Sequence, residues 1–318
     1  MKRTAPLRLQ VDGVLLLDKP IGITSNAAIQ RVKRLFNAAK AGHVGTLDPL
    51  ASGLLPVCLG EATKFSTDMF SADKSYEAEL LLGVTTTTGD TEGEVTSRQA
   101  VAVSPDQVVA VLQRFTGALE QTPPMYSALK RDGKPLYAYA RAGQTVERAS
   151  RSITIHAIAL LSTALAAGRF TVSVRCTKGT YIRVLAEDIG SALGCGATLA
   201  RLRRTSVGEF GLQQAVALDQ LEALSAAERA STLLPVDCLV AGLPAVVLGT
   251  DSVRRILKGQ TAQAATAQNA GLVRLYDQER HFLGLGELQA GGQLAPKRLL
   301  VAPAPLSGVC LLRTPKIA

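Results

Sequence analysis

The sequence contains few of the residues that commonly build metal sites and base-stacking surfaces. It has no Trp, aromatic residues make up 4% of its 318 residues, and its three histidines lie far apart at positions 43, 156 and 281. So few aromatics argue against a single-strand nucleic-acid binder that works mainly by base stacking. The scattered histidines argue against a zinc site, because zinc ligands cluster at short spacings.

Cysteines and long apolar runs are also scarce. The five cysteines, at positions 58, 176, 195, 238 and 310, form no CxxC pair and no Cys/His cluster. This pattern indicates reduced, mostly structural thiols in a cytoplasmic protein. No apolar run reaches the roughly 18–20 residues of a membrane span, and the apolar stretch behind the basic N-terminus is too short for a signal peptide. We therefore expect a cytoplasmic protein without a membrane partner.

Positive charge is what the sequence has in excess. The net charge is +9 and the pI is about 9.5, which favours a polyanionic partner, nucleic acid before an anionic membrane. A chain of 318 residues suggests two domains at about 100–200 residues each. Near residue 245 the composition changes to short apolar runs broken by Gly and Asn. We expect one domain over residues 1–245 and a small β-rich module over residues 246–318.

The periodicity of apolar residues predicts an α+β protein. A continuous apolar run predicts a buried strand over residues 13–18, and alternation predicts strands over residues 76–82 and 170–177. Helices are predicted over residues 25–36, 105–115, 181–194 and 218–230. Ser25 is the expected N-cap of the first helix, and a capping box of Ser104 and Gln107 opens the second. Turn-rich loops are expected over residues 41–56 and 85–95.

Residues 121–151 form a basic segment with many turn-forming residues and few core positions. Its part from 130 to 151 carries six basic and two acidic residues. A basic excursion of this size in a compact enzyme is usually a functional loop, but a solvated surface loop has the same composition. The run RLRR at 201–204 is a second basic cluster.

The loop over residues 41–56 holds one acidic side chain, Asp48. Asp48 precedes Pro49, which pushes it toward an extended conformation, and Leu47 and Leu50 flank it. The pattern predicts a rigidly held carboxylate in an otherwise apolar pocket wall, where it needs a cationic partner. An ordinary Asx–Pro turn gives the same tripeptide.

Motifs of other enzyme classes are missing. The sequence has no GxSxG, no HExxH, no Walker A motif and no GxGxxG followed by a ribose-binding acid. No second carboxylate is evidently paired with Asp48, so a single acid would have to act alone as nucleophile or base. We expect neither a metal ion nor an organic cofactor.

The segment GHVGTLDPLASGLLPVCLGEATKF (42–65) closely resembles the central motif of the bacterial tRNA pseudouridine synthase B family. That family acts on the T-loop uridine at tRNA position 55. Four further segments match it in order, at residues 13–26, 74–83, 123–141 and 176–190, and the tail at 284–300 resembles its small RNA-binding module of the PUA type. The resemblance implies a mixed, mainly antiparallel sheet flanked by helices, with residues 121–151 as a thumb-like RNA-binding insertion and a monomer that binds the tRNA T-arm stem-loop.

By position, the resemblance implies that Asp48 is the catalytic aspartate, that Tyr76 is a catalytic pocket residue and that Arg183 pairs with the aspartate. It also implies substrate- or RNA-binding roles for His43, Tyr181, Lys19, Pro20, Lys64 and Lys130. Lys19 and Pro20 match a motif that buttresses the pocket, and His43 matches a residue that contacts the RNA around a flipped base.

Simpler explanations exist for the individual residues. Arg183 fits a surface helix position that pairs with Glu187 at i+4, both tyrosines fit ordinary core positions, and a loop histidine such as His43 commonly bonds to backbone. Uridine isomerisation requires a base to be flipped out of folded RNA. The sequence leaves open whether Asp48 then attacks C1′, attacks C6 or acts as a base at C2′. Two other functions stay open: a non-catalytic tRNA-binding or folding protein on this scaffold, and a synthase with a different RNA target.

Overall fold

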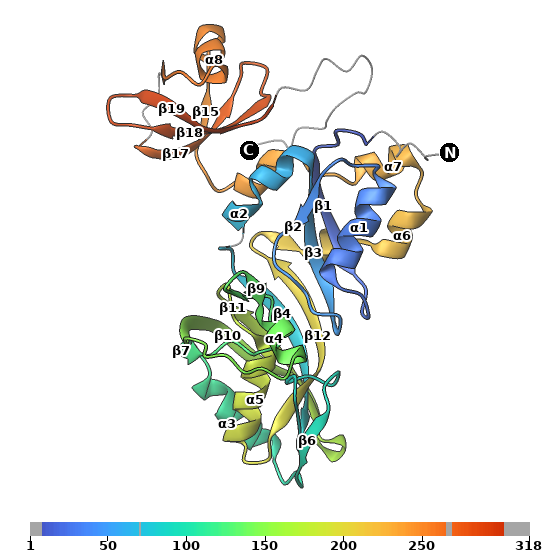
Figure 1. The fold of residues 1–318 in the computed structure, drawn as a ribbon. Helices are drawn as coiled ribbons and strands as arrows, with labels where there is room; N and C mark the ends of the chain where they lie inside the picture. Colours follow the sequence, from blue (N-terminus) through green and yellow to red (C-terminus); the bar gives the residue numbers. More distant parts are fainter. Residues whose placement is uncertain (1–7, 70, 265–268, 302–318) are drawn as a thin grey trace. The chain divides into compact units, whose positions relative to one another are not determined.

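The computed structural model describes residues 8–69, 71–264 and 269–301. The chain divides into two compact units, Met1–Leu239 and Val240–Ala318, shown in Figure 1. Of the cysteines, Cys58, Cys176 and Cys195 are buried and Cys238 is half-buried, and all four are free. Cys310 lies outside the described residues.

The first unit is organised around one long mixed sheet. Its strands follow the order β14 (Val216–Ala217), β1 (Gly13–Lys19), β3 (Ala51–Leu59), β12 (Ala197–Val207), β4 (Lys74–Leu82), β11 (Arg169–Cys176), β10 (Arg151–Ala164) and β7 (Gly117–Gln121). Two short strands, β2 (Ala41–His43) and β13 (Phe210–Gly211), pair with β3 and β12. The pairs β1–β14 and β3–β12 are parallel and the other pairs are antiparallel. The predicted α+β class with a mainly antiparallel sheet is confirmed.

Four of the helices described in the first unit bury their apolar faces in one core with the sheet. The longer ones are α1 (Ser25–Leu35), α3 (Pro105–Arg114) and α5 (Ile182–Ala192), and α2 (Ser66–Met69), α4 (Leu136–Arg141), α6 (Leu218–Ala223) and α7 (Ala226–Ser231) are short. Buried side chains of α1, α3, α5 and α6 join those of the sheet in one cluster. The capping box of Ser104 and Gln107 is present at the start of α3, as predicted.

Two helix boundaries differ from the sequence prediction. The N-cap of α1 is Thr24, whose side chain accepts from the Ala27 N–H, because the Ser25 hydroxyl is buried and used elsewhere. The single helix expected over 218–230 is two helices. Leu224 is extended, and Ser225 caps α7 with a capping box to Glu228, so the local cap ends the apolar periodicity.

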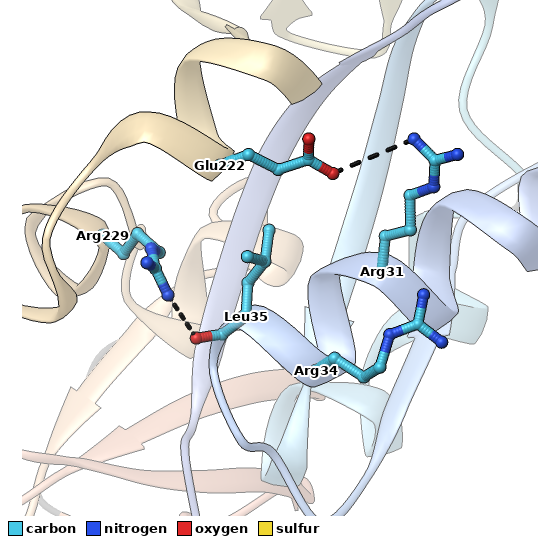
Figure 2. A pocket seen from close by; sticks show the side chains of 5 residues that line it. All are labelled: Arg31, Arg34, Leu35, Glu222 and Arg229. Carbon is cyan, nitrogen blue, oxygen red and sulfur yellow. Dashed lines mark hydrogen bonds and ion pairs between the residues drawn. The ribbon is translucent and has the colours of Figure 1, made fainter.

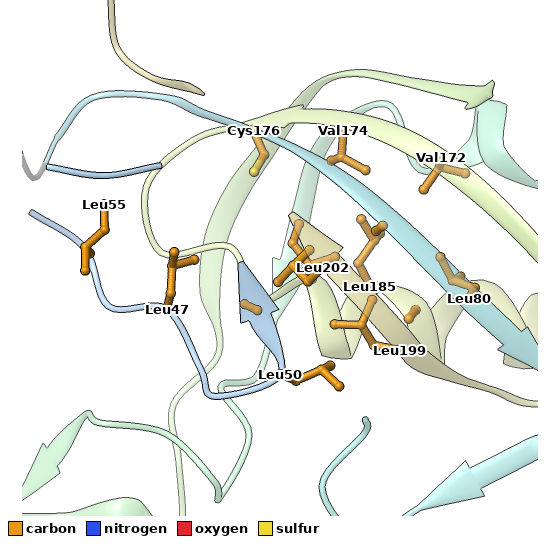
Figure 3. Packing of buried hydrophobic residues seen from close by; sticks show 14 of the residues in the cluster. Leu47, Leu50, Leu55, Leu80, Val172, Val174, Cys176, Leu185, Leu199 and Leu202 are labelled. Carbon is orange, nitrogen blue, oxygen red and sulfur yellow. The ribbon is translucent and has the colours of Figure 1, made fainter. Parts of the chain in front are cut away.

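The segment over residues 41–56 is less irregular than predicted, since β2 and β3 occupy its two ends. The turn between them is anchored on both sides of the aspartate: Leu47 and Leu50 are buried in the main core. Figure 3 shows them beside core leucines such as Leu199 and Leu202. The Ser25 hydroxyl donates to the Leu47 carbonyl at 2.9 Å and accepts from its N–H at 2.8 Å. The turn is thereby fixed to the start of α1.

The basic segment 121–151 has few buried positions, as predicted. It contains a short hairpin of two strands with two residues each, β8 (Lys130–Arg131) and β9 (Lys134–Pro135), followed by α4. Only four residues of this segment are buried: Gln121, Pro123, Ser127 and Leu136.

The second unit is a β-rich module, as expected. Its five-stranded sheet has the order β15 (Ala245–Val247), β17 (Gly271–Tyr276), β18 (Phe282–Leu288), β19 (Gln293–Leu299) and β16 (Ala262–Gln263). One helix, α8 (Thr250–Leu257), was not predicted; it buries Ile256 in the core of this unit. Among all described residues, no helix is long and apolar enough to span a bilayer.

Candidate active site

A pocket of about 360 Å³ opens in the first unit around Asp48. Its walls come from the turn before β3, the first residues of β4 and β10, the start of the basic segment's hairpin, the loop into α5, and β12. Four residues implied by the family resemblance line it: Asp48, Tyr76, Tyr181 and Arg183. Segments distant in sequence thus bring the predicted catalytic set together.

Arg183 holds Asp48 by an ion pair, as the resemblance implied. The arginine lies in the first turn of α5, its side chain is 5% exposed, and its Nη2 is 3.0 Å from the Asp48 carboxylate. The carbonyls of Thr88 and Tyr126 accept from the same guanidinium at 2.8 and 2.7 Å. The simpler surface pairing of Arg183 with Glu187 is wrong, because the guanidinium points into the pocket. A nearly buried arginine fixed by carbonyls thus gives the Asp48 carboxylate a positioned cationic partner.

A second carboxylate, Asp90, also contacts this guanidinium. Its Oδ2 is 3.5 Å from Arg183 Nε, and its side chain is 6% exposed. The Thr88 hydroxyl and the Glu92 N–H donate to it at 2.6 and 3.1 Å. The sequence prediction that one acid stands alone missed it. Asp90 lies in the turn of a hairpin, β5 (Val84–Thr86) with β6 (Val95–Arg98), where a loop was expected.

The pocket wall carries many cations beside its apolar side chains. Lining side chains include five bases and only one acid, Asp48; the bases are Lys74, Arg151, Lys178, Arg183 and Arg204. Leu47, Leu129 and Leu202 line the pocket as well, so the predicted apolar wall is present but is interrupted by these cations. Excess positive charge suits a phosphodiester substrate.

Tyr76 lies on β4 directly across from Arg204 on β12. Arg204 is 1% exposed, and the carbonyls of Leu54 and Gly45 accept from it at 2.7 and 3.0 Å. Burial raises the pKa of Tyr76, and the Arg204 guanidinium at its hydroxyl acts in the opposite direction. One member of the basic RLRR cluster is therefore a buried pocket residue, which the composition of the cluster alone did not reveal.

Gly53 shows how closely the aspartate turn packs on Arg204. A Cβ at Gly53 would lie 2.3 Å from the Arg204 carbonyl oxygen, and its φ of +101° is one that glycine adopts freely.

Lys19 and Pro20 are not among the residues that line the pocket. Lys19 is fully buried at the end of β1, and its ammonium donates to the carbonyls of Pro20 and Ile23 at 2.8 and 2.7 Å. Burial lowers the pKa of Lys19 to about 8, and the nearby Asp48 and Glu92 charges partly offset this shift. These contacts fit the buttressing role that the resemblance implied.

The other proposed RNA-binding residues are not brought to the pocket wall. Lys64 is paired with Glu61 at 2.6 Å, and Lys130 is exposed on β8. His43 is half-buried in β2, and its Nδ1 is a buried atom without a hydrogen-bond partner among the described residues. Burial and the charge of Arg204 lower the pKa of His43. Backbone bonding of the His43 ring, the simpler prediction, is absent for this nitrogen.

No group of three or more His, Cys, Asp or Glu side chains that could hold a metal ion occurs in the described part of the chain. The chemistry that the pocket itself offers is an ionised carboxylate, a tyrosine hydroxyl next to an arginine, and several cations. Tyr181 adds an aromatic face, covered by the Arg151 guanidinium at 4.8 Å from the ring centre.

Comparison with known families covers the chain from residue 33 to residue 300. Residues 33–182 match the TruB family pseudouridylate synthase N-terminal domain. Residues 183–241 match the tRNA pseudouridylate synthase B C-terminal domain, and residues 244–300 match the C-terminal region of pseudouridine synthase II TruB. The chain belongs to the TruB family of pseudouridylate synthases. It is therefore an isomerase that acts on uridine in RNA, as predicted.

Similar TruB-family proteins align over almost their whole length. A protein of Cupriavidus metallidurans named tRNA pseudouridine synthase B is 54% identical, covering 93% of this chain and 98% of that relative. One of the same name from Burkholderia mallei is 55% identical, covering 93% and 99%. A third, from Methylobacillus flagellatus, is 54% identical, covering 92% and 97%.

The pseudouridine synthase fold of the TruB family is also found in solved structures with lower identity. A chain of a Cbf5–Nop10–Gar1 complex superposes with a TM-score of 0.63 at 27% identity, covering 88% of this chain and 79% of that one. A chain of the archaeal box H/ACA sRNP Nop10–Cbf5 complex gives a TM-score of 0.65 at 26% identity, covering 94% and 88%. The predicted fold class is confirmed.

Proposed function

We propose that this TruB-family enzyme converts the uridine at position 55 in the T-loop of tRNA to pseudouridine, with Asp48 as its reactive carboxylate. The relatives that align over 93% of the chain are named for tRNA. The observation that carries the proposal is the Arg183–Asp48 ion pair of 3.0 Å inside a positively charged pocket. An ionised carboxylate, fixed in place and surrounded by cations, is what a single-acid reaction on an RNA nucleotide requires.

The isomerisation needs the target base outside the RNA stack. The N1–C1′ bond breaks, the uracil turns, C5 bonds to C1′, and the proton that C5 loses is balanced by the one that N1 gains. We infer that the flipped nucleotide enters the pocket with its base against Tyr76, and that His43 contacts the RNA that the base leaves. Asp48 attacks C1′ or C6, or removes a proton from C2′. Tyr76, next to Arg204, is the candidate for proton transfer at C5.

The remaining parts of the chain are proposed to hold the RNA. Residues 1–245 form the catalytic domain, with 121–151 as its thumb-like insertion carrying Lys130. Residues 246–318 form the PUA-like RNA-binding module, and Lys64 contributes a further RNA contact. We also infer, as expected from the sequence, a monomer that binds the T-arm stem-loop in the cytoplasm.

The test separates this proposal from the two other functions. Unmodified tRNA transcripts, wild type and with cytidine at position 55, are incubated with the enzyme and with Asp48→Asn, and pseudouridine is mapped. We expect a single pseudouridine at position 55, made by the wild-type enzyme on the wild-type transcript alone. Pseudouridine at another position would identify a different RNA target. Binding of tRNA without product would identify a non-catalytic binding protein.

A further inference from the structure

A second hollow of about 300 Å³ lies in the first unit between helices α1, α6 and α7. Five residues line it: Arg31, Arg34, Leu35, Glu222 and Arg229. It shares no lining residue with the pocket around Asp48, and nothing in the mechanism above uses it. Figure 2 shows arginines reaching it from two sides, two from α1 and one from α7. We name this the arginine pocket and define it by Arg31, Arg34 and Arg229.

Arg229 is held in place by backbone. The carbonyl of Leu224 accepts from its Nε at 2.9 Å, and the carbonyl of Leu35 accepts from its Nη1 at 2.7 Å. Both acceptors are neutral, so the positive charge of Arg229 is positioned without being neutralised. A guanidinium fixed in this way loses little entropy when it binds an anion.

The two arginines of α1 are available to a ligand. Arg31 and Arg34 are three residues apart and therefore neighbours on one side of the helix. Arg31 is 3.8 Å from Glu222, with side chains 45% and 46% exposed, a long and exposed pair that contributes little. Arg34 has no side-chain hydrogen bond or ion pair among the described residues. The helix macrodipole favours cations near the end of α1, and Arg229 from another helix adds a third cation there through its bond to the Leu35 carbonyl.

Charge and geometry identify the ligand. Three guanidiniums and one carboxylate leave a surplus of two positive charges around a hollow. Guanidinium groups bind phosphate in bidentate fashion, which makes phosphate the matching anion.

The length of helix α1 sets the approximate distance between the arginine pocket and Asp48. Ser25, at its first turn, is hydrogen-bonded to Leu47, the residue before Asp48. Arg31 and Arg34 follow six and nine residues later, which is about 9 and 14 Å along a helix with a rise of 1.5 Å per residue. A nucleic-acid strand at about 3.4 Å per nucleotide covers that length in about three to four nucleotides.

We propose that the arginine pocket binds a phosphate of the substrate RNA backbone, a few nucleotides from the uridine that enters the Asp48 pocket. The RNA source rests on the proposed function, whereas the phosphate chemistry does not. The arginine pocket contributes to RNA affinity and to the position of the RNA along the protein, and it takes no part in bond breaking. Inorganic phosphate or a free nucleotide would be recognised by the same groups, and the experiment separates these sources.

Four single variants test the proposal in the full-length protein. Arg34→Gln and Arg31→Gln remove guanidiniums, Glu222→Gln removes the competing carboxylate, and Lys33→Gln is the matched control. Lys33 lies in the same last turn of α1 but does not line the pocket, so its replacement weakens the helix-end charge equally. Dissociation constants for tRNA are measured from 50 to 200 mM salt, together with single-turnover rates at saturating tRNA.

We expect Arg34→Gln to weaken tRNA binding by about tenfold to a hundredfold, the usual effect of one charged hydrogen-bonding contact. Its salt slope should fall by about 0.7–0.9, the loss of one phosphate contact. Glu222→Gln should tighten binding, Lys33→Gln should leave it unchanged, and saturating rates should stay within about twofold. Equal effects of Arg34→Gln and Lys33→Gln, or no tightening by Glu222→Gln, would overturn the proposal.

A second arm identifies the source of the phosphate. Binding of inorganic phosphate and of a nucleoside monophosphate is measured in the wild type and in Arg34→Gln. If the variant loses millimolar binding of these ligands but keeps its affinity for tRNA, the site serves a small molecule and the RNA assignment is wrong. If tRNA affinity depends on Arg34 while no pseudouridine forms at position 55, the arginine pocket stands and the proposed function fails.

Discussion

At the residue scale, Arg183 is the cation that links the two carboxylates at the reactive pocket, Asp48 and Asp90. It contacts two carboxylates and two carbonyls at once. Asp48 is partly open to solvent, with 42% of its side chain exposed, whereas Asp90 is buried beside the same guanidinium. Because of this difference in exposure, Asp48 is accessible to a nucleotide, whereas the buried Asp90 helps to fix the Arg183 side chain.

Arg183→Met and Asp90→Asn are expected to differ in severity. Arg183→Met removes the partner of Asp48 and leaves a carboxylate unpaired, so single-turnover rates should fall by about a thousandfold or more. Asp90→Asn leaves both carbonyl contacts of Arg183 in place, so a loss of about tenfold to a hundredfold is expected. The two substitutions combined should be far from additive. Independent, additive effects on the rate would show that Asp90 does not act through Arg183.

Lys19→Met should flatten the dependence of unfolding free energy on pH above neutrality. The pKa of Lys19 is lowered from 10.5 to about 8 in the folded protein, so the unfolded chain binds more protons between these values. Stability therefore rises with pH across this window, by about 3 kcal/mol for such a shift. Urea unfolding at pH 7.5 and pH 10 should show a smaller gain in the variant than in the wild type. Lys74 and the buried thiols titrate in both proteins and cancel in the difference; equal gains would contradict the buried state of Lys19.

At the element scale, the first turn of α1 connects the helix to the turn that carries Asp48. Ser25→Ala should leave the Leu47 N–H and carbonyl without partners, at a cost of about 2–4 kcal/mol. Turnover should fall as well, because Asp48 follows directly. Thr24→Ala removes only the N-cap, at about 1 kcal/mol, and should keep full activity. Chemical unfolding and single-turnover assays of both variants provide the check, and equal losses of activity would show that the Ser25 contact does not position the turn.

The elements that could be predicted from the sequence are those whose signal is local. β4 and β11 follow strict alternation, and α3 has its capping box, so their positions agree with the structure. The break between α6 and α7 was missed because Ser225 sits inside an apolar helical pattern. Asp90 and Arg204 were missed for a different reason. The roles of Asp90 and Arg204 depend on contacts with strands and turns that are distant in sequence. The local residue pattern around either residue does not reveal these contacts.

At the scale of the whole molecule, the β-rich module over residues 246–318 is expected to serve binding rather than chemistry. Deleting residues 246–318 should weaken tRNA affinity and reduce the salt slope by about 0.7–0.9 for each lost phosphate contact. Turnover at saturating tRNA should stay largely intact, since no residue of the Asp48 pocket lies beyond Arg204. Binding titrations and single-turnover assays on the folded truncated protein measure the two effects separately. Unchanged affinity would remove the tail from the RNA-binding surface.

The most direct measurement of the central claim is pseudouridine formation by Asp48→Asn on unmodified tRNA. The substitution nearly preserves shape but removes the charge that Arg183 pairs with at 3.0 Å, and an amide can neither attack carbon nor accept a proton. We predict normal tRNA affinity, a folded protein, and a single-turnover rate lower than wild type by many orders of magnitude. A folded Asp48→Asn protein that forms pseudouridine at close to the wild-type rate would contradict the assignment of Asp48 and the mechanism built on it.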